Sequence, residues 1–284
     1  MSMGNKSRTR LWLAFSTCFF LIFQYDLSAL SLDAEIRRME SSRTIDGINQ
    51  YATLLLIAEK YTEAAESFRA LNRLTGEAQY LFNAALSLST GRIAGDLDIW
   101  REYFKIPLKN RDGQRWDDLA TLVMNSSALG SFDNPEILIK SVRNLYLGGG
   151  LYTALCLIRM HRSLQSKAAI GSSILADFSL REAEIMYRFG FHQDSLTLFR
   201  DHFKQTGDEN CVVMMARCAY KMDDCALAEQ YISFVKNTAL KNFSFFVLWT
   251  RVLECLGRPV EAKEKMSMAG KLARTDREKK IAGQ

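Results

Sequence analysis

Small residues recur at a fixed spacing along this chain, and that spacing constrains the fold more than any other feature. Ala52 and Ala64 are twelve residues apart, with the polar turn AEKY between them. The same separation joins Ala183 to Ser195, Ala216 to Ala228, and Thr250 to Ala262. From Ser195 to Ala228 is 33 residues, and from Ala228 to Ala262 is 34. A fixed period of this size predicts a stacked array of similar structural units.

A large apolar residue follows the second small residue of each pair by four positions, about one turn of a helix. These residues are Phe68, Phe199, Ile232 and Met266. Two antiparallel helices can approach closely where small side chains meet, and the large side chain then fills the gap beside the crossing. Such a hairpin cannot cover its own apolar face, so it needs a stacked neighbour. Only 3 prolines occur and no stretch alternates long enough for a sheet, so we expect an all-α protein.

This arrangement resembles the tetratricopeptide repeat family, whose helix–turn–helix units of about 34 residues carry the same small–small–large pattern. The segments most similar to the family are QYATLLLIAEKYTEAAESFRAL and LWTRVLECLGRPVEAKEKMSMA. The resemblance covers most of residues 45–270 and implies a right-handed superhelical array of antiparallel helix hairpins, an α-solenoid. The proline that follows the second helix in the family is absent from every unit.

The expected repeat domain spans residues 32–284 and is irregular at about 80–135. There, YLFNAALSLSTG and GDLDIWREYF predict one degenerate hairpin, and RWDDLATLVMNSSALG predicts a further helix after the break at Pro107. A weaker unit, VRNLYLGGGLYTALCLI, matches the pattern at Ala154, but Val142 occupies its small first-helix position. The segment SLQSKAAIGSS predicts an insertion before the next unit.

Residues 1–31 have the pattern of a targeting segment. Basic residues precede the apolar run LWLAFSTCFFLIF, which is shorter than the roughly 20 residues of a membrane span and suits a signal peptide. Small residues at Ala29 and Ser31 predict cleavage after Ser31. An uncleaved N-terminal anchor is the main alternative, and membrane association would then occur only through this segment.

The leader predicts an exported protein of the periplasm or cell envelope. Two possible glycosylation sequons, at Asn125 and Asn242, leave a eukaryotic secretory compartment open. The net charge of +5 is mild and spread along the chain, so the composition does not predict a nucleic-acid partner.

Five cysteines remain after the predicted cleavage, and an odd number suits a disulfide framework poorly. Cys211, Cys218 and Cys225 are spaced by seven, which is typical of positions in a helical core, and the chain has no CxxC pair. We therefore expect buried free thiols in preference to a bridge or a metal site.

The sequence does not predict an enzyme, a cofactor or a metal. It lacks the nucleophile-elbow, zinc-protease and phosphate-loop motifs. The triple glycine Gly148–Gly150 follows an apolar helix and predicts a hairpin turn. The three histidines are expected to be solvated or packed, and no catalytic residue is assigned.

The resemblance does imply a binding surface. In the family, the first helix of each hairpin lines a concave groove, and two positions on it face that groove: the one after the small residue and the one three further on. Here those pairs are Arg143 and Tyr146, Glu184 and Tyr187, Arg217 and Tyr220, and Arg251 and Glu254. The partner-binding candidates are Arg143, Tyr146, Tyr187, Arg188, Arg217, Tyr220, Lys221 and Arg251. An aliphatic row lies beside them: Ile139, Leu180, Val213 and Val247. Alternatively, the tyrosines and arginine stems cover apolar surface between helices.

We therefore expect an exported, noncatalytic scaffold or adaptor that binds a protein segment in its groove, such as part of a transporter or secretion assembly. The alternative is a small-molecule or lipid-binding accessory of an envelope transporter, with its pocket in the irregular 80–175 region. A closed apolar cavity would favour this alternative, and an open groove would favour the scaffold.

Overall fold

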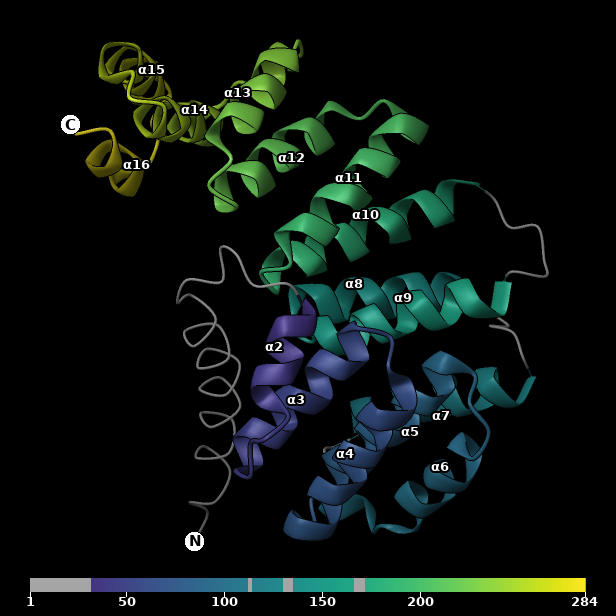
Figure 1. The fold of residues 1–284 in the computed structure, drawn as a ribbon. Coiled ribbons are helices and arrows are strands. Elements are labelled where there is room, and N and C mark those ends of the chain that lie inside the picture. The colour runs from purple at the N-terminus through teal and green to yellow at the C-terminus, as the bar shows by residue number, and fades with distance from the viewer. Residues whose placement is uncertain (1–31, 112–113, 130–134, 166–171, 284) are drawn as a thin grey trace, which may run out of the picture. The chain divides into compact units, whose positions relative to one another are not determined.

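The computed structural model describes residues 32–111, 114–129, 135–165 and 172–283, and all regular structure within these ranges is helical (Figure 1). The predicted targeting segment, and residues 166–171 within the predicted insertion SLQSKAAIGSS, lie outside them. The chain divides into two compact units, the first ending at Gly171 and the second beginning at Ser172. Among the described helices, none has the length and apolar character needed to cross a membrane.

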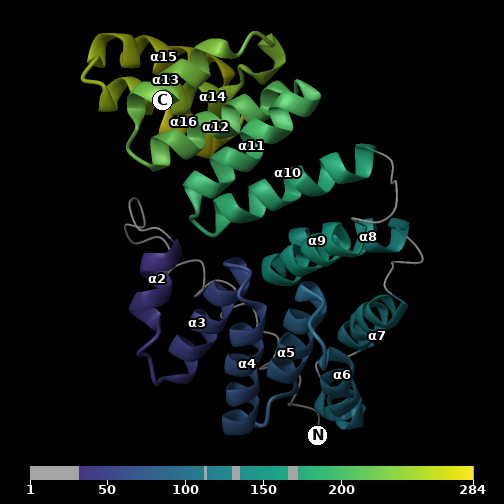
Figure 2. The ribbon, with the colours of Figure 1, turned by 45° about the vertical axis from the view of Figure 1, so that its right-hand side comes forward.

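The first unit consists of eight described helices and one turn of 3-10 helix. They are α2 (Leu32–Met39), α3 (Ile45–Ile57), α4 (Tyr61–Thr75), α5 (Ala78–Gly91), α6 (Asp96–Lys105), η1 (Leu108–Asn110), α7 (Gln114–Leu129), α8 (Pro135–Leu147) and α9 (Leu151–Gln165). Helices α3, α4 and α5 run alternately up and down beside one another (Figure 2). The hairpin α5–α6, the helix α7 and the glycine turn between α8 and α9 are confirmed.

The second unit is a succession of three hairpins. Its elements are α10 (Ser172–Arg188), α11 (His192–Thr206), α12 (Glu209–Lys221), α13 (Cys225–Phe234), η2 (Thr238–Leu240), α14 (Phe243–Cys255), α15 (Pro259–Leu272) and α16 (Asp276–Ile281). Helix α10 pairs with α11, α12 with α13, and α14 with α15, and α12 also packs on α11. The array of antiparallel, tetratricopeptide-like hairpins that the period predicted is therefore present in this unit.

The small residues of each pair are all buried where the two helices of a hairpin meet. In two hairpins a hydroxyl crosses the contact: Ser195 Oγ donates to the carbonyl of Ala183 at 2.8 Å, and Thr250 Oγ1 donates to that of Ala262 at 3.5 Å. The predicted crossing sites are thus confirmed. Phe68, Phe199 and Ile232 are fully buried beside them, whereas Met266 is half-buried because no long helix follows α15.

Polar caps set where the helices of the second unit begin. The side chains of Asp208, Asp224 and Asn242 accept hydrogen bonds from backbone N–H groups in the first turns of α12, α13 and α14. Helix α11 ends at Gly207, whose φ of +70° is a left-handed conformation that glycine adopts without steric cost. These capping residues end one helix and begin the next within a few residues, so the connections between helices are short.

Helix α5 lies at the centre of the first unit, and all of its residues from Tyr80 to Thr90 are buried. It contacts α4, α6 and α7, and also α9, which returns from later in the chain. On α9, the buried Arg159 donates to the carbonyls of Leu56 at 3.1 Å and Ile57 at 2.8 Å, at the end of α3. Carbonyls at the end of a helix run out of helical N–H donors. The Leu56 carbonyl also accepts from the backbone N–H of Glu59 at 3.0 Å, and Arg159 adds a side-chain donor to both carbonyls. The first unit is therefore not a simple stack of adjacent hairpins.

A buried carboxylate joins α5, α6 and α7. Asp96 accepts hydrogen bonds from Ser89 Oγ, at 2.7 Å, and from Ser127 Oγ, and Trp100 Nε1 donates to Ser89 Oγ at 3.0 Å. Edge-on aromatic rings surround Phe82, with the Trp100 ring centroid 5.3 Å away. Buried hydrogen bonds and aromatic packing thus stabilise α5, α6 and α7, the region that departs most from the repeat pattern.

Cys225 and Cys255 form a disulfide, so the prediction of free thiols is wrong for these two residues. Cys225 begins α13 and Cys255 ends α14, and the stacking of successive hairpins places their Cα atoms 6.2 Å apart. The other described cysteines, Cys156, Cys211 and Cys218, are buried free thiols as expected. Burial raises the pKa of each to about 12, which makes them poor nucleophiles.

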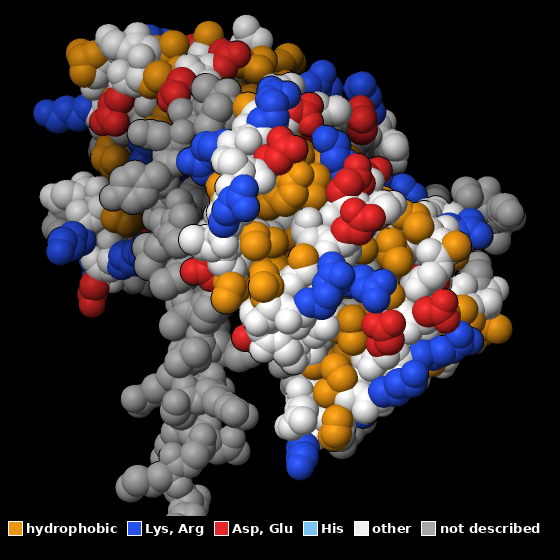
Figure 3. All heavy atoms as spheres, turned by 60° about the horizontal axis from the view of Figure 1, so that its bottom comes forward, with side chains coloured by type: hydrophobic (Ala, Val, Ile, Leu, Met, Phe, Trp, Pro, Cys, Tyr) orange, Lys and Arg blue, Asp and Glu red, His pale blue; other side chains and the backbone are white. Residues whose placement is uncertain are grey.

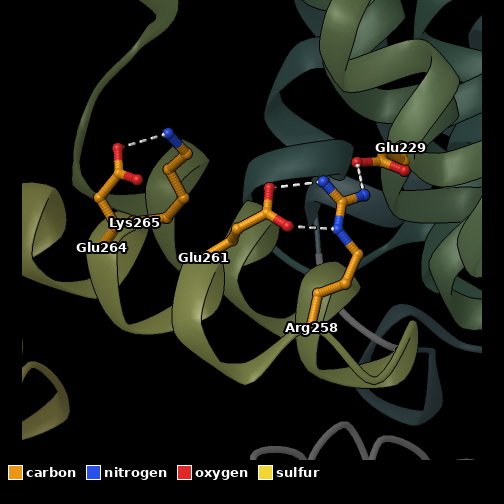
Figure 4. A network of polar contacts seen from close by, with 5 residues as sticks. All are labelled: Glu229, Arg258, Glu261, Glu264 and Lys265. Atoms are coloured by element: carbon orange, nitrogen blue, oxygen red, sulfur yellow. Dashed lines mark hydrogen bonds and ion pairs between the residues drawn. The ribbon is translucent and has the colours of Figure 1, made fainter.

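Arg258 connects the last two hairpins (Figure 4). It precedes α15 and binds Glu261 on that helix through Nε and Nη2, while Nη1 contacts Glu229 on α13 at 2.5 Å. The planar guanidinium suits this forked geometry, in which one residue pairs with two carboxylates. Arg258 thereby fixes the direction in which α15 leaves the turn.

Candidate partner-binding surface

Three first helices of the second unit, α10, α12 and α14, carry the same pattern around their crossing residues Ala183, Ala216 and Thr250. Each residue advances about 100° around a helix, so the fourth residue after the crossing lies about 40° from it and the fifth about 140°. Accordingly, Tyr187 and Tyr220 are half-buried, whereas Arg188 and Lys221 are exposed. The first residue after the crossing lies about 100° away, between these two positions. Arg217 and Arg251 occupy this position on α12 and α14.

Side chains of α10, α11 and α12 come close together at this surface. The ring of Tyr187 lies 5.1 Å from the ring of His192, centroid to centroid. Burial, and in addition the positive charge of Lys221, lowers the pKa of His192 to about 4. Burial raises the pKa of Tyr187, and the charge of Arg217 opposes that rise. Lys221 and Arg217, both on α12, are therefore close to side chains of the preceding hairpin.

Arg217 extends the surface towards α14. Its Nη2 lies 3.4 Å from Ser244 Oγ in the first turn of α14, and its Nη1 lies 3.7 Å from Met214 Sδ on its own helix. Arg251, further along α14, is exposed. We call the set Tyr187, Arg188, Arg217, Tyr220, Lys221 and Arg251 the basic surface of the second unit.

Part of the predicted set belongs to the core. The rings of Tyr187 and Tyr220 pack against the buried residues of the second unit, as the packing alternative expected for their apolar parts. Leu180 and Val213 also pack there and Val247 is buried, so most of the predicted aliphatic row supports the hairpins. The guanidinium and ammonium groups are what the basic surface presents to solvent.

The two remaining candidates lie on α8 in the first unit. Arg143 is exposed and Tyr146 is half-buried, as expected one and four positions after the crossing residue Val142. They form a separate pair within that unit.

Sequence reasoning missed three residues that contribute to the basic surface: His192, Met214 and Ser244. His192 opens the second helix of its hairpin, and Ser244 belongs to the start of the next hairpin. The rule used only the positions one and four residues after each small residue, so it could not include them. His192 lies beside a predicted turn, whereas Met214 lies three residues before Arg217 on the same helix.

Two acidic residues also occupy the predicted groove-facing positions of these first helices. Glu184 on α10 is paired with Arg181 at 2.8 Å, and Glu254 on α14 is exposed. Figure 3 shows one face on which basic and acidic side chains are interleaved with hydrophobic ones.

Two hollows in the described residues bear on the small-molecule alternative. A hollow of about 710 Å³ is lined by seven residues of α15 alone, including Val260 and Met268, so it is an open depression on one helix. The other, of about 210 Å³, is lined by polar groups such as Arg159 and Ser163, and it is smaller than the usual 300–1,000 Å³ of a ligand pocket. Neither is the closed apolar cavity that the alternative needs.

Comparison with known proteins gives likeness only at the level of solved structures. No family model matches the chain, and no curated protein sequence matches it. A tetratricopeptide repeat protein from Parabacteroides merdae aligns over 88% of this chain and 88% of its own, with 13% identity and a TM-score of 0.40. The P58(IPK) TPR domain aligns over 94% of this chain and 96% of its own, with 12% identity and a TM-score of 0.29. At these scores the assignment of the fold rests on the hairpins themselves.

Proposed function

We propose that this protein is a noncatalytic scaffold that binds a segment of another protein on the basic surface of its second unit. The observation that carries the proposal is the presence of cationic groups on successive first helices, where Arg188, Lys221 and Arg251 are exposed and Arg217 is half-buried. Half-buried tyrosine rings lie beside them on α10 and α12. Arginine pairs with carboxylates through a planar fork, and both arginine and tyrosine are common anchors at protein interfaces. The partner segment is therefore acidic and extended along the stack.

We further propose that the protein is exported to the periplasm or cell envelope, where the partner belongs to a transporter or secretion assembly. Two features support export: the signal-peptide pattern of residues 1–31, and the Cys225–Cys255 disulfide, which suits an oxidising compartment. N-terminal sequencing of the protein isolated from its host should start near Leu32. An intact Met1 on soluble cytosolic protein would contradict export.

The binding proposal is tested by reversing charge on the basic surface. Partners captured with the unaltered chain are identified and then titrated with the Arg217→Glu/Lys221→Glu/Arg251→Glu variant. Repulsion of an acidic segment should weaken binding by at least about 2 kcal/mol at low salt, and by less at high salt because exposed charges are screened.

A matched control reverses three exposed charges on second helices: Arg200 on α11, and Lys263 and Lys271 on α15. This variant should bind the partner as the unaltered chain does, and both variants should melt at nearly the original temperature. Equal binding by both variants would place the partner elsewhere. Loss of folding in the first variant alone would show that Arg217 and its neighbours are packing residues.

A further inference from the structure

Three potential metal ligands meet at the joint between α11 and α12, away from the residues of the basic surface. They are His202 in the last turn of α11, Asp208 at the cap of α12, and Cys211 in the first turn of α12. A ring nitrogen of His202, a carboxylate oxygen of Asp208 and the Sγ of Cys211 all lie within 4.8 Å of one another. Gly207 makes the tight turn that brings the end of α11 against the start of α12.

His202 is an unusual member of this group because its surroundings leave a polar atom unsatisfied. The side chain is buried, with 4% of its surface exposed, and its Nδ1 has no hydrogen-bond partner. A buried polar atom without a partner costs roughly 1–3 kcal/mol, and native structures contain few of them. Coordination of a metal ion by Nδ1 would remove this cost.

The other two ligands are also positioned for an ion. Cys211 is fully buried, and Asp208 Oδ1 accepts hydrogen bonds from the backbone N–H of Asn210 at 3.0 Å and from its Nδ2 at 2.8 Å. These bonds fix the carboxylate and leave Oδ2 as a further donor atom. Hydrogen bonds to the ligand side chains hold metal ligands in place in this way.

The ligand charges suit a divalent ion. Once the ion is bound, the thiol loses its proton to solvent, and one thiolate with one carboxylate balances two positive charges.

We propose that His202, Asp208 and Cys211 bind one Zn²⁺ ion at the α11–α12 joint. Nitrogen, sulfur and carboxylate oxygen are the donors that zinc takes in proteins, and three protein ligands leave the fourth tetrahedral position to a water molecule. Imidazole and thiolate are poor ligands for Mg²⁺ and Ca²⁺, which prefer oxygen. Because its ligands come from successive hairpins, the ion would fasten α12 to α11 and stabilise the second unit.

The test is a titration of the untagged full chain with Co²⁺ and then Zn²⁺, without thiol reductant so that the Cys225–Cys255 disulfide stays intact. The expected result is one Co²⁺ per chain, with a thiolate-to-metal absorption band and the intense visible bands of a tetrahedral site. Zn²⁺ should displace the cobalt, because zinc has no geometric preference from its d-electrons and favours tetrahedral sites of nitrogen, sulfur and oxygen ligands. Zn²⁺ should also raise the melting temperature.

Four variants decide which residues are responsible. Cys211→Ser should abolish the thiolate band, whereas Cys156→Ser and Cys218→Ser, at the other buried free thiols, should keep it. Asp208→Asn should weaken metal binding at least tenfold while leaving the metal-free melting temperature nearly unchanged, because asparagine caps a helix as well as aspartate does.

The proposal is wrong if the unaltered chain binds no Co²⁺ or gives no thiolate band. It is equally wrong if the band survives in Cys211→Ser or vanishes in Cys218→Ser. Should Cys211→Ser fail to fold, the Asp208→Asn variant still decides, since unchanged affinity there would exclude the site.

Discussion

The Cys225–Cys255 disulfide allows the stability of the second unit to be predicted from its structure. The bridge joins residues 30 apart in sequence and connects the start of α13 to the end of α14. For a loop of this length, the chain-entropy relation gives about 3.6 kcal/mol of stabilisation at 25 °C. In a unit of this size, that should correspond to a melting shift on the order of 10–15 °C.

The perturbation is reduction with a phosphine, compared with the Cys225→Ser/Cys255→Ser variant. Cys255 is exposed, so the reductant can reach the bridge in the folded protein. Urea unfolding should show the free energy of unfolding of the second unit falling by about 3.6 kcal/mol on reduction. The serine variant should unfold like the reduced protein and should not respond to the reductant.

Counting thiols provides an independent check. In the chain from Leu32 onward, alkylation after unfolding without reductant should label three cysteines, namely Cys156, Cys211 and Cys218, and all five after reduction. Five labels without reductant, or a serine variant as stable as the oxidised protein, would refute the bridge and the stacking of α13 on α14 that it requires.

Three further predictions concern packing and buried polar groups. Ala228→Phe should overpack the α12–α13 crossing and cost about 1–3 kcal/mol in urea unfolding, whereas Ala226→Phe, exposed on the same helix, should cost little. Asp96→Ala should cost about 1–3 kcal/mol, because it leaves buried hydroxyls without their acceptor; unchanged unfolding would show that the network is dispensable. Burial lowers the pKa values of His161 and His192 to about 4, so the unfolded chain binds more protons and stability should fall as the pH drops from about 6.5 to about 4. Replacing both by glutamine should flatten this part of the stability profile, and an unchanged profile would contradict their burial.

Much of the second unit could be predicted because its rules are local. The crossing of α12 and α13 depends on Ala216 and Ala228, which a spacing of twelve residues identifies without any tertiary information. The packing of α9 on α5 could not be predicted in this way. It joins helices far apart in sequence, and Arg159, which binds the end of α3, looks in the sequence like any surface arginine.

The candidate sites were predictable to different degrees. The positions of Arg217 and Arg251 follow from the angle between successive helical residues. Their burial does not, because Arg251 is exposed whereas Arg217 is half-buried beside Met214 and Ser244. The Cys225–Cys255 bridge depends on how one hairpin stacks on the next. The sequence did not predict it, because an odd number of cysteines argued against disulfides. The grouping of His202 with Cys211 depends on the tight turn at Gly207, for which no metal-binding motif was available as a guide.

The enclosure of α5 has a consequence for how the two units open. Amide protons of α5 can exchange with solvent only when several surrounding helices separate, so its slowest protons should report concerted unfolding of the first unit. In the second unit, each hairpin packs mainly against its immediate neighbours. In an array of this kind, local unfolding begins at an end. Amide exchange in the second unit should therefore be fastest at α16 and should slow towards α12. The first unit is expected to unfold cooperatively, and the second to unfold one hairpin at a time.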